Sequence, residues 1–104
     1  EAMALVEAAG VDPAKVREAL LGGFAGSRIL EVHGQRMIDR AFKPGARVTT
    51  QYKDMRQACE LGARLGQALP ATELGRDLFL RLIEQGDGDL DHSALIRVLQ
   101  KPRG

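Results

Sequence analysis

"VDPAKVREALLGGFAGSRILEVHGQRMIDRAFKPG", residues 11–45, decides the fold, because it carries the start and stop signals of two successive helices. Asp12 is of a residue type that caps helix N-termini, and Pro13 suits the first helical position, where its missing N–H would be unpaired anyway. Ser27 predicts the cap of the second helix in the same way. A glycine pair follows the first helix and a Pro-Gly pair follows the second, and both pairs are typical of turns. This stretch therefore predicts two short helices with tight connections.

Apolar side chains recur at helical spacing within both predicted helices. They predict one inward face for each helix, made of Val16, Ala19 and Leu20 in the first and of Ile29, Leu30, His33, Met37 and Ile38 in the second. Gly34 interrupts the second stripe and costs about 1 kcal/mol against alanine by helix propensity. The connector GGFAG, residues 22–26, is glycine-rich, but no strand precedes it. A helix-to-helix connector is therefore favoured there over a ligand loop.

Four more helices are predicted on either side of this stretch. The first helix of the chain is predicted to end at Gly10, and the fourth helix to run from about Thr50 to Ala68 with Pro70 as its stop. Thr72 is the predicted cap of the fifth helix. The last helix is predicted to begin after Asp91 and to end at Pro102. No segment shows the alternation and β-branched content of a strand. The expected fold class is all-α, a compact bundle of about six helices with short connections.

The three C-terminal helices have predicted inward faces of different character. In the fourth helix the face is made of Met55, Cys59, Gly62 and Gly66, with Leu61, Leu65 and Leu69 beside them. In the fifth helix it is made of Leu74, Leu78, Phe79, Leu82 and Ile83. In the last helix it is made of Leu95, Val98 and Leu99. Small residues let two helix backbones approach closely, and two glycines make their helix dependent on a packing partner. The apolar face of the fifth helix is wide enough to be buried on more than one side. Both features predict a subunit interface.

Composition limits the possible functions. The 104 residues fit one domain, and aromatic residues make up only 4%, so the core must be aliphatic, which favours helices. Fifteen basic and 14 acidic side chains give a net charge of +1, which argues against nucleic-acid binding through bulk positive charge. No apolar run is long enough to cross a bilayer. A single cysteine cannot form an internal disulfide, and a cytoplasmic protein is expected.

Three acidic residues and two histidines are the candidate metal ligands in the sequence. Asp87, Asp89 and Asp91 alternate along the chain and imitate the opening of a calcium loop. The sixth position of such a loop needs glycine for its sharp turn, and here it is His92. A polar loop that ends in a helix cap explains the same residues. His33 lies far from His92 in the sequence, and neither has another ligand at metal spacing, so no metal site is expected.

Cys59 has no base at a recognisable spacing, so a buried inert thiol is expected rather than a nucleophile. Lys53 and Asp54 leave two interpretations open on the residues alone. They form either a solvated ion pair on a first helical turn or a lysine that faces a ligand. A cation is disfavoured near a helix N-terminus by the helix dipole, which is a small reason to look for an anion that Lys53 serves.

Three segments together resemble the C-terminal helical domain of the β-hydroxyacid dehydrogenases: residues 11–45, YKDM at 52–55 and LDHSAL at 90–95. The resemblance covers essentially the whole chain in the right order and spacing. Within the family, the chain is similar to the 2-hydroxy-3-oxopropionate (tartronate semialdehyde) reductases, with the 3-hydroxyisobutyrate dehydrogenases and the glyoxylate/succinic semialdehyde reductases as relatives. The implied fold is that of the C-terminal domain of 6-phosphogluconate dehydrogenase-type enzymes.

The resemblance implies an NAD(P)-dependent oxidoreductase that interconverts a small hydroxy acid and its semialdehyde. Its N-terminal Rossmann domain binds NAD or NADP, and the active site lies in the cleft between the two domains. The family's catalytic lysine falls upstream of Glu1, so this chain holds no catalytic residue and should be inactive alone. Lys53 corresponds to a lysine that contacts the cofactor near the nicotinamide, and Asp54 to an aspartate on the substrate side. Ala46 stands where relatives often carry a large apolar or aromatic residue that shapes the substrate pocket.

The chain opens inside a helical pattern, with no initiator methionine and no N-cap. We therefore expect residues 1–104 to form a single helical domain, a C-terminal fragment of a longer enzyme. The expected partners are its own Rossmann domain, a small carboxylate substrate and further copies in a homo-oligomer, without nucleic acid or membrane. The alternative interpretation is a free-standing helical protein-interaction module without catalytic activity.

Overall fold

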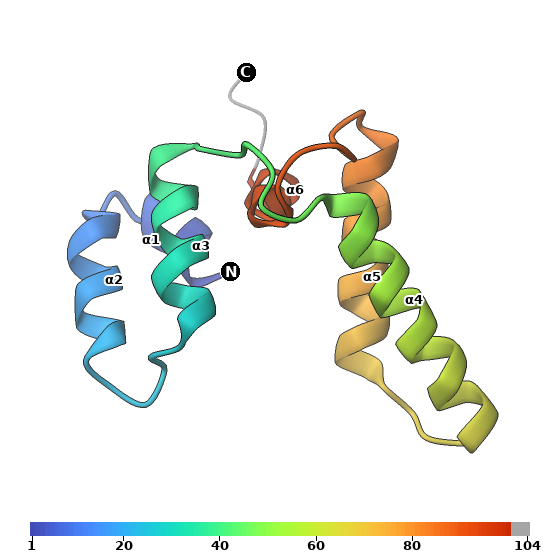
Figure 1. The fold of residues 1–104 in the computed structure, drawn as a ribbon. Coiled ribbons are helices and arrows are strands. Elements are labelled where there is room, and N and C mark those ends of the chain that lie inside the picture. The colour runs from blue at the N-terminus through green and yellow to red at the C-terminus, as the bar shows by residue number, and fades with distance from the viewer. Residues whose placement is uncertain (101–104) are drawn as a thin grey trace.

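Residues 1–100 are described by a computed structural model, and their regular secondary structure is helical (Figure 1). The elements run in the order α1 (Ala2–Ala8), α2 (Pro13–Leu21), α3 (Arg28–Asp39), α4 (Val48–Leu65), α5 (Pro70–Glu84), the 3-10 turn η1 (His92–Leu95) and α6 (Ile96–Leu99). None of the helices in this range is long and apolar enough to cross a membrane. The prediction of an all-α fold with six helices is confirmed, while the predicted stop at Pro102 lies outside the described residues.

The predicted start signals of α2 and α3 are confirmed. The Asp12 carboxylate accepts a hydrogen bond from the N–H of Ala14 at 3.0 Å, and the Ser27 hydroxyl accepts one from the N–H of Leu30 at 3.0 Å. Each bond satisfies a backbone donor that the first turn of a helix leaves unpaired. Helix α1 ends just before Gly10, as predicted, and the φ of 72° at Gly10 lies in the left-handed region that glycine adopts at little cost.

The boundaries of α4 and α5 differ from the predicted ones. Helix α4 begins at Val48, two residues before the predicted cap Thr50. It ends before Gly66, which turns left-handed with a φ of 69°. Pro70 occupies the first position of α5, so it starts a helix rather than stopping one, and the predicted cap Thr72 lies inside that helix.

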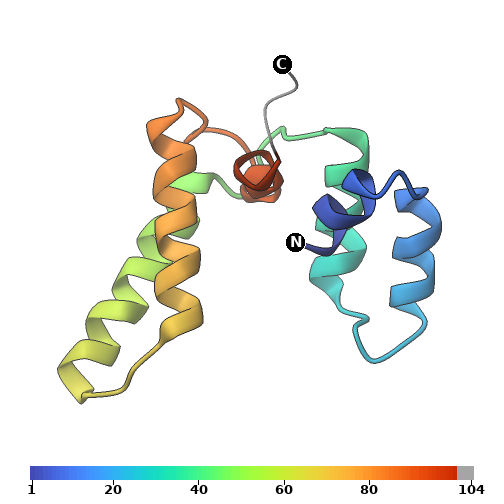
Figure 2. The ribbon, with the colours of Figure 1, turned by 180° about the vertical axis from the view of Figure 1, so that it is seen from behind.

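The helices form two groups, and η1 and α6, which we call the C-terminal turn (residues 92–99), lie between them (Figure 1). We call α1–α3 the lobe (residues 2–39) and α4–α5 the hairpin (residues 48–84). Helices α4 and α5 pack against each other, and η1 and α6 contact both groups. The view from behind shows the same arrangement (Figure 2). The radius of gyration is 14.7 Å, against about 13 Å for a compact domain of 100 residues, which reflects this division into two groups.

The core lies where the hairpin meets η1. Its buried members are Val48, Phe79, Leu82 and Ala94, and partly buried apolar side chains pack around them, namely Phe42, Tyr52, Met55, Ile83, Leu90, Leu95 and Val98. Helix α4 contributes a face on which inward residues recur every three or four positions. The hairpin therefore packs on η1 through the start of α4 and the C-terminal part of α5.

The predicted inward face of the last turn is confirmed in part. Leu95 and Val98 are half-buried and pack against the core, whereas the buried residues of this turn include Ala94 and Ile96, which were not predicted. The segment starts with a 3-10 turn, which has three residues per turn rather than 3.6, so the inward positions shift along the sequence.

Small residues let α4 and α5 approach closely. A Cβ atom on Gly62 would lie 2.8 Å from the carbonyl oxygen of Gln67, and one on Gly75 would lie 2.5 Å from the terminal methyl group of Met55. The small-residue stripe of α4 is therefore used within the chain. Leu61 and Leu65, predicted beside that stripe, are exposed.

Candidate functional site

Lys53 and Asp54 lie in the second turn of α4, between two residues, Tyr52 and Met55, that pack on the core. The Nζ atom of Lys53 lies 3.5 Å from a carboxylate oxygen of Asp54, and the two side chains are 52% and 57% exposed. An ion pair this exposed contributes about 0–1 kcal/mol. The ammonium group can therefore leave Asp54 for another anion at little cost.

The start of α4 at Val48 changes the place of Lys53 in its helix. The sequence predicts Lys53 in the first helical turn, where the dipole disfavours a cation. Lys53 is instead the sixth residue of α4, and the effect of the dipole falls off within the first turn. The geometry that remains is a half-exposed charge pair on the outward side of a helix whose inner side is packed.

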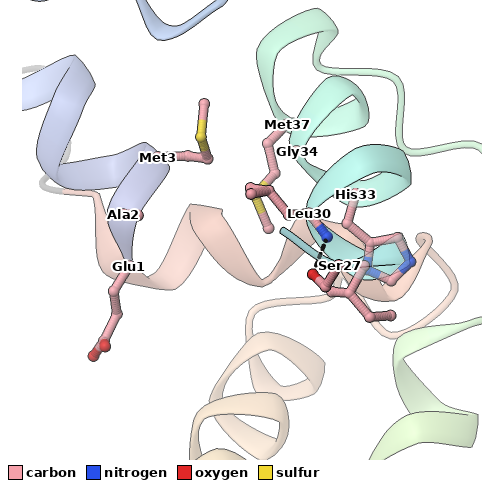
Figure 3. Close-up of a pocket in the computed structure, with 9 residues that line it drawn as sticks. Glu1, Ala2, Met3, Ser27, Leu30, His33, Gly34 and Met37 are labelled. Atoms are coloured by element: carbon pink, nitrogen blue, oxygen red, sulfur yellow. Dashed lines mark hydrogen bonds between the residues drawn. The ribbon is translucent and has the colours of Figure 1, made fainter. Parts of the chain in front are cut away.

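A small hollow of about 190 Å³ lies between the start of α1 and α3 (Figure 3). Met3, Leu30 and Met37 give it an apolar lining, and His33 is an ionisable residue beside them. Small-molecule sites usually measure about 300–1,000 Å³, so this hollow is too small for a dinucleotide. Lys53 does not line it.

A larger open groove of about 1230 Å³ is lined by residues of α1, of the end of α5 and of α6. Arg40, Arg81 and Arg97 line it together with two acidic residues. Glu7 pairs with Arg40 at 2.7 Å, and Asp87 pairs with Arg97 at 3.3 Å. Four of the five charged side chains that line this groove are thus paired with one another.

Asp91 is fully buried, and both oxygens of its carboxylate accept several hydrogen bonds. One oxygen accepts from the Arg36 guanidinium at 2.9 Å and from the N–H groups of Gly45 at 2.9 Å and Ala46 at 3.2 Å. The other accepts from the N–H and the hydroxyl of Ser93. Burial acts to raise the pKa of this carboxyl, but the hydrogen bonds from Ser93, Gly45 and Ala46 stabilise the charged form and hold the pKa well below its usual range.

His33 and His92 meet in space although they lie far apart in the sequence. Their ring centroids are 4.3 Å apart and the ring planes are inclined by 74°, an edge-to-face contact. Partial burial and the neighbouring His92 lower the pKa of His33. Sequence spacing contained no signal for this contact, because it depends on how η1 docks against α3.

His33, Asp91 and His92 form the one group of three potential metal ligands found among residues 1–100, with their ligand atoms within 4.8 Å of one another. Asp91 already accepts five hydrogen bonds, so it could bind a cation only by breaking some of them. Arg36 adds a positive charge 2.9 Å from that carboxylate. The two imidazoles alone do not complete a zinc site, which uses three or four protein ligands.

Other residues singled out in the sequence take structural roles. Asp87 pairs with Arg97, and Asp89 is exposed, so the alternating acidic residues do not converge. Cys59 is a free, buried cysteine, as predicted. Residues 22–26 connect α2 to α3, as predicted.

Comparison with known proteins identifies the relatives of this chain. Residues 1–99 match the family "NAD-binding of NADP-dependent 3-hydroxyisobutyrate dehydrogenase". The chain is 46% identical over 100 residues to 2-hydroxy-3-oxopropionate reductase of Escherichia coli (strain K12), a match that covers 96% of the chain and 34% of the reductase. It is 36% identical over 101 residues to probable 3-hydroxyisobutyrate dehydrogenase-like 1, mitochondrial, of Arabidopsis thaliana, covering 97% of the chain and 30% of that protein. The chain spans about a third of the length of these curated relatives. Because the family match extends over nearly all of its length, the chain belongs to this 3-hydroxyisobutyrate dehydrogenase family, within the β-hydroxyacid dehydrogenases.

Proposed function

We propose that this chain is the C-terminal helical domain of an NAD(P)-dependent oxidoreductase that interconverts a small hydroxy acid and its semialdehyde. The family match over residues 1–99 carries the proposal. The 46% identity to a 2-hydroxy-3-oxopropionate reductase favours that substrate class. Because the chain spans 34% of that reductase, we assign the binding of the dinucleotide phosphates and the proton-transferring lysine to a Rossmann domain outside residues 1–104.

In this proposal, Lys53 and Asp54 border the cleft between the two domains. A dinucleotide and a carboxylate substrate are both anions, and a half-exposed ammonium group suits them. Lys53 provides positive charge to the cofactor near its nicotinamide end, and Asp54 supports the substrate side. The dinucleotide, when bound, supplies or accepts the hydride. Helix α4 holds both side chains on a rigid element whose inner face is packed against the core.

We also propose that Ala46 borders the substrate pocket. Its backbone is held on both sides, because its N–H donates to Asp91 and its carbonyl oxygen accepts from the N–H of His92 at 2.8 Å. A methyl side chain on a fixed backbone leaves more room at this point than an aromatic ring would. The size of the preferred hydroxy acid should therefore depend on position 46.

The test is the substitution Lys53→Ala in the intact protein, assayed for NADH- and NADPH-dependent reduction of 2-hydroxy-3-oxopropionate. We expect kcat/KM to fall by at least about tenfold, the cost of losing about 1.4 kcal/mol of binding to the cofactor or the transition state. Arg56→Ala is the matched control, because Arg56 is an exposed cation one turn along the same helix, and its ion pair within residues 1–100 is the loose one with Glu60 at 3.7 Å. Wild-type kinetics for Lys53→Ala would contradict the assigned role, and an intact protein without any hydride transfer would favour the interaction module instead.

We further propose that the intact enzyme is a homo-oligomer. Large apolar side chains are exposed on both groups of helices, among them Leu5, Phe24, Ile29, Leu61, Leu65 and Leu74. Leu61, Leu65 and Leu74 all belong to the hairpin. Leu61 and Leu65 are one turn apart on α4, and exposed apolar side chains are common on surfaces that bind another protein surface.

A further inference from the structure

The lobe and the hairpin meet chiefly through the C-terminal turn. Helix α3 packs on η1 and α1 packs on α6, while α4 and α5 pack on the same two elements from the hairpin side. Figures 1 and 2 show α6 between the two groups in both views. The relative orientation of the groups therefore depends on what fixes η1 to each of them.

Asp91, the residue that caps η1, is bonded to three separate parts of the chain. Its carboxylate accepts from Arg36 of α3, from the N–H groups of Gly45 and Ala46 in the segment before α4, and from Ser93 of η1 itself. We call these five residues the joint. The joint thus ties the lobe, the hairpin and the C-terminal turn to a single buried charge.

Backbone hydrogen bonds extend the joint to the first turn of α4. The N–H of Val48 donates to the carbonyl oxygen of Leu90 at 2.9 Å, and the N–H of Thr49 donates to that of Gly88 at 3.1 Å. The cap residue Arg47 makes no side-chain cap bond. The start of α4 is therefore fixed by the segment that leads into Asp91, and Lys53 lies one turn further along.

The charge at Asp91 makes this arrangement resistant to deformation. A carboxylate removed from water costs several kcal/mol unless its lone pairs are satisfied. Hydrogen bonds to a charged group are directional and stronger than neutral ones, so a shift of α3 or of the segment before α4 would leave a buried charge short of donors. In the observed arrangement of the lobe and the hairpin, all five hydrogen bonds to Asp91 are made together.

We propose that Arg36 and Asp91 are positioning residues that set the angle between the lobe and the hairpin. For its consequence on activity, the inference rests on the function proposed above. With the angle fixed, Lys53 and Asp54 are held at a constant place relative to the lobe. Arg36 is the informative residue, because it is the donor that reaches Asp91 from the lobe.

The angle can be measured by spin labels in the intact protein. One label replaces Lys15, exposed on α2, and the other replaces Glu73, exposed near the start of α5, both in a Cys59→Ala background. We expect a narrow distance distribution in the otherwise wild-type protein, a broadened one in Arg36→Met, and recovery of the narrow one in Arg36→Lys. A second label pair at Thr50 and Glu73, both within the hairpin, serves as the control and should not change.

An unchanged distribution between lobe and hairpin in Arg36→Met would overturn the proposal. Broadening of the pair within the hairpin as well would also overturn it, because Arg36 would then support the fold in general. Arg36→Met leaves four of the five bonds to Asp91 in place, so the variant tests the angle without removing the buried charge or its cap on η1.

Kinetics connect the angle to activity. We expect Arg36→Met to lower kcat/KM for the hydroxy acid by about 10- to 100-fold, as a small misplacement of positioning groups does, and Arg36→Lys to restore part of it. If Lys53→Ala impairs turnover while Arg36→Met changes neither turnover nor the distances, the role of the joint is wrong and the proposed function stands. If both Lys53→Ala and Arg36→Met turn over as wild type while the spin-label distances respond to Arg36, the joint is right and the assigned role of Lys53 is wrong.

Discussion

Asp91 holds a negative charge at a position from which water is excluded. Five hydrogen bonds, from Arg36, Gly45, Ala46 and Ser93, replace the solvent around it. Removing a single partner from such a group leaves part of the desolvation cost uncompensated. Each donor therefore adds to the stability of the fold, and it does so while the carboxylate is ionised.

This charge predicts a loss of stability in acid. The pKa of Asp91 is lowered in the folded protein, whereas an unfolded aspartate takes up a proton near pH 4. The unfolded chain therefore binds more protons than the folded one at and below about pH 4, so this contribution is present above about pH 5 and declines as the pH falls toward the lower folded pKa. Urea midpoints measured between pH 7 and pH 3 should fall less steeply for Asp91→Asn than for the wild type.

The mild variant Ser93→Ala should lower the free energy of unfolding by about 1.5–3 kcal/mol at neutral pH and by less in acid. Parallel pH profiles for all three proteins would show that Asp91 carries no such contribution.

Residues that act locally were predictable from the sequence, and those that act across the fold were not. Asp12 and Ser27 were identified as caps because their partners lie two and three residues away. Asp91 was identified as a cap for the same reason, but its bonds to Arg36 and to the segment before α4 join parts of the chain far apart in the sequence. No pattern in a single sequence shows those partners.

At the scale of elements, the α4–α5 hairpin depends on a glycine in the last turn of α4. Gly62 leaves space for the carbonyl of Gln67 and the side chain of Leu69, which return along the same face. The N–H of Gln67 also donates to the carbonyl of Gly62 at 2.8 Å. The tight reversal from α4 to α5 therefore uses the absence of a side chain at position 62.

We predict that Gly62→Ala destabilises the hairpin although alanine is the better helix former. The new methyl group would lie 2.8 Å from the backbone oxygen of Gln67 and 2.9 Å from Leu69, and the backbone would have to shift at a cost of about 1–3 kcal/mol. Hydrogen exchange of the α4 and α5 amides in the intact protein should show faster opening of this hairpin. Ala63→Gly, exposed one position on, gives the effect of propensity alone, about 1 kcal/mol. Slower exchange in Gly62→Ala would mean that propensity outweighs packing.

Helices whose boundaries are set by nearby residues were predictable from the sequence, and a helix start that is set by distant residues was not. Helices α2 and α3 carry their caps within the sequence and were placed correctly. The start of α4 was misplaced because its first N–H groups bond to carbonyls of residues 88 and 90 rather than to a nearby cap. The Lys53–Asp54 pair is visible in the sequence, but its role at a ligand comes from the resemblance and stays a prediction, since its spacing alone does not separate a ligand contact from a solvated pair.

At the scale of the whole molecule, the exposed apolar side chains of the hairpin are prominent. Leu65 is 72% exposed, and Leu61 and Leu74 are 49% and 59% exposed. The packing face of α4 is already occupied by α5, so these leucines are surplus to the internal core. They are the basis for the proposed contact with a second copy.

We predict that Leu65→Asp in the intact protein shifts the subunit equilibrium toward the monomer while helicity is retained. A charge placed on an apolar contact must be desolvated or unpaired when two copies associate. Analytical ultracentrifugation over a concentration series measures the shift, and circular dichroism checks the helices. Thr50→Asp adds the same charge on an exposed position of α4 away from the leucines and should not change the assembly. A wild-type protein that sediments as a monomer at high concentration would rule out the oligomer.

The place of Asp91 in the chain has a consequence for how the protein is made. Both groups of helices precede Asp91 in the sequence, so a ribosome, adding about 5–20 residues per second, exposes the lobe and the hairpin before the carboxylate that ties them. Each group can form its own helices during translation, with α2 against α3 and α4 against α5, while the nascent chain between them is still free to swivel. The orientation of the lobe relative to the hairpin is then set in a late docking step, when Asp91 binds Arg36 and the backbone amides of Gly45 and Ala46.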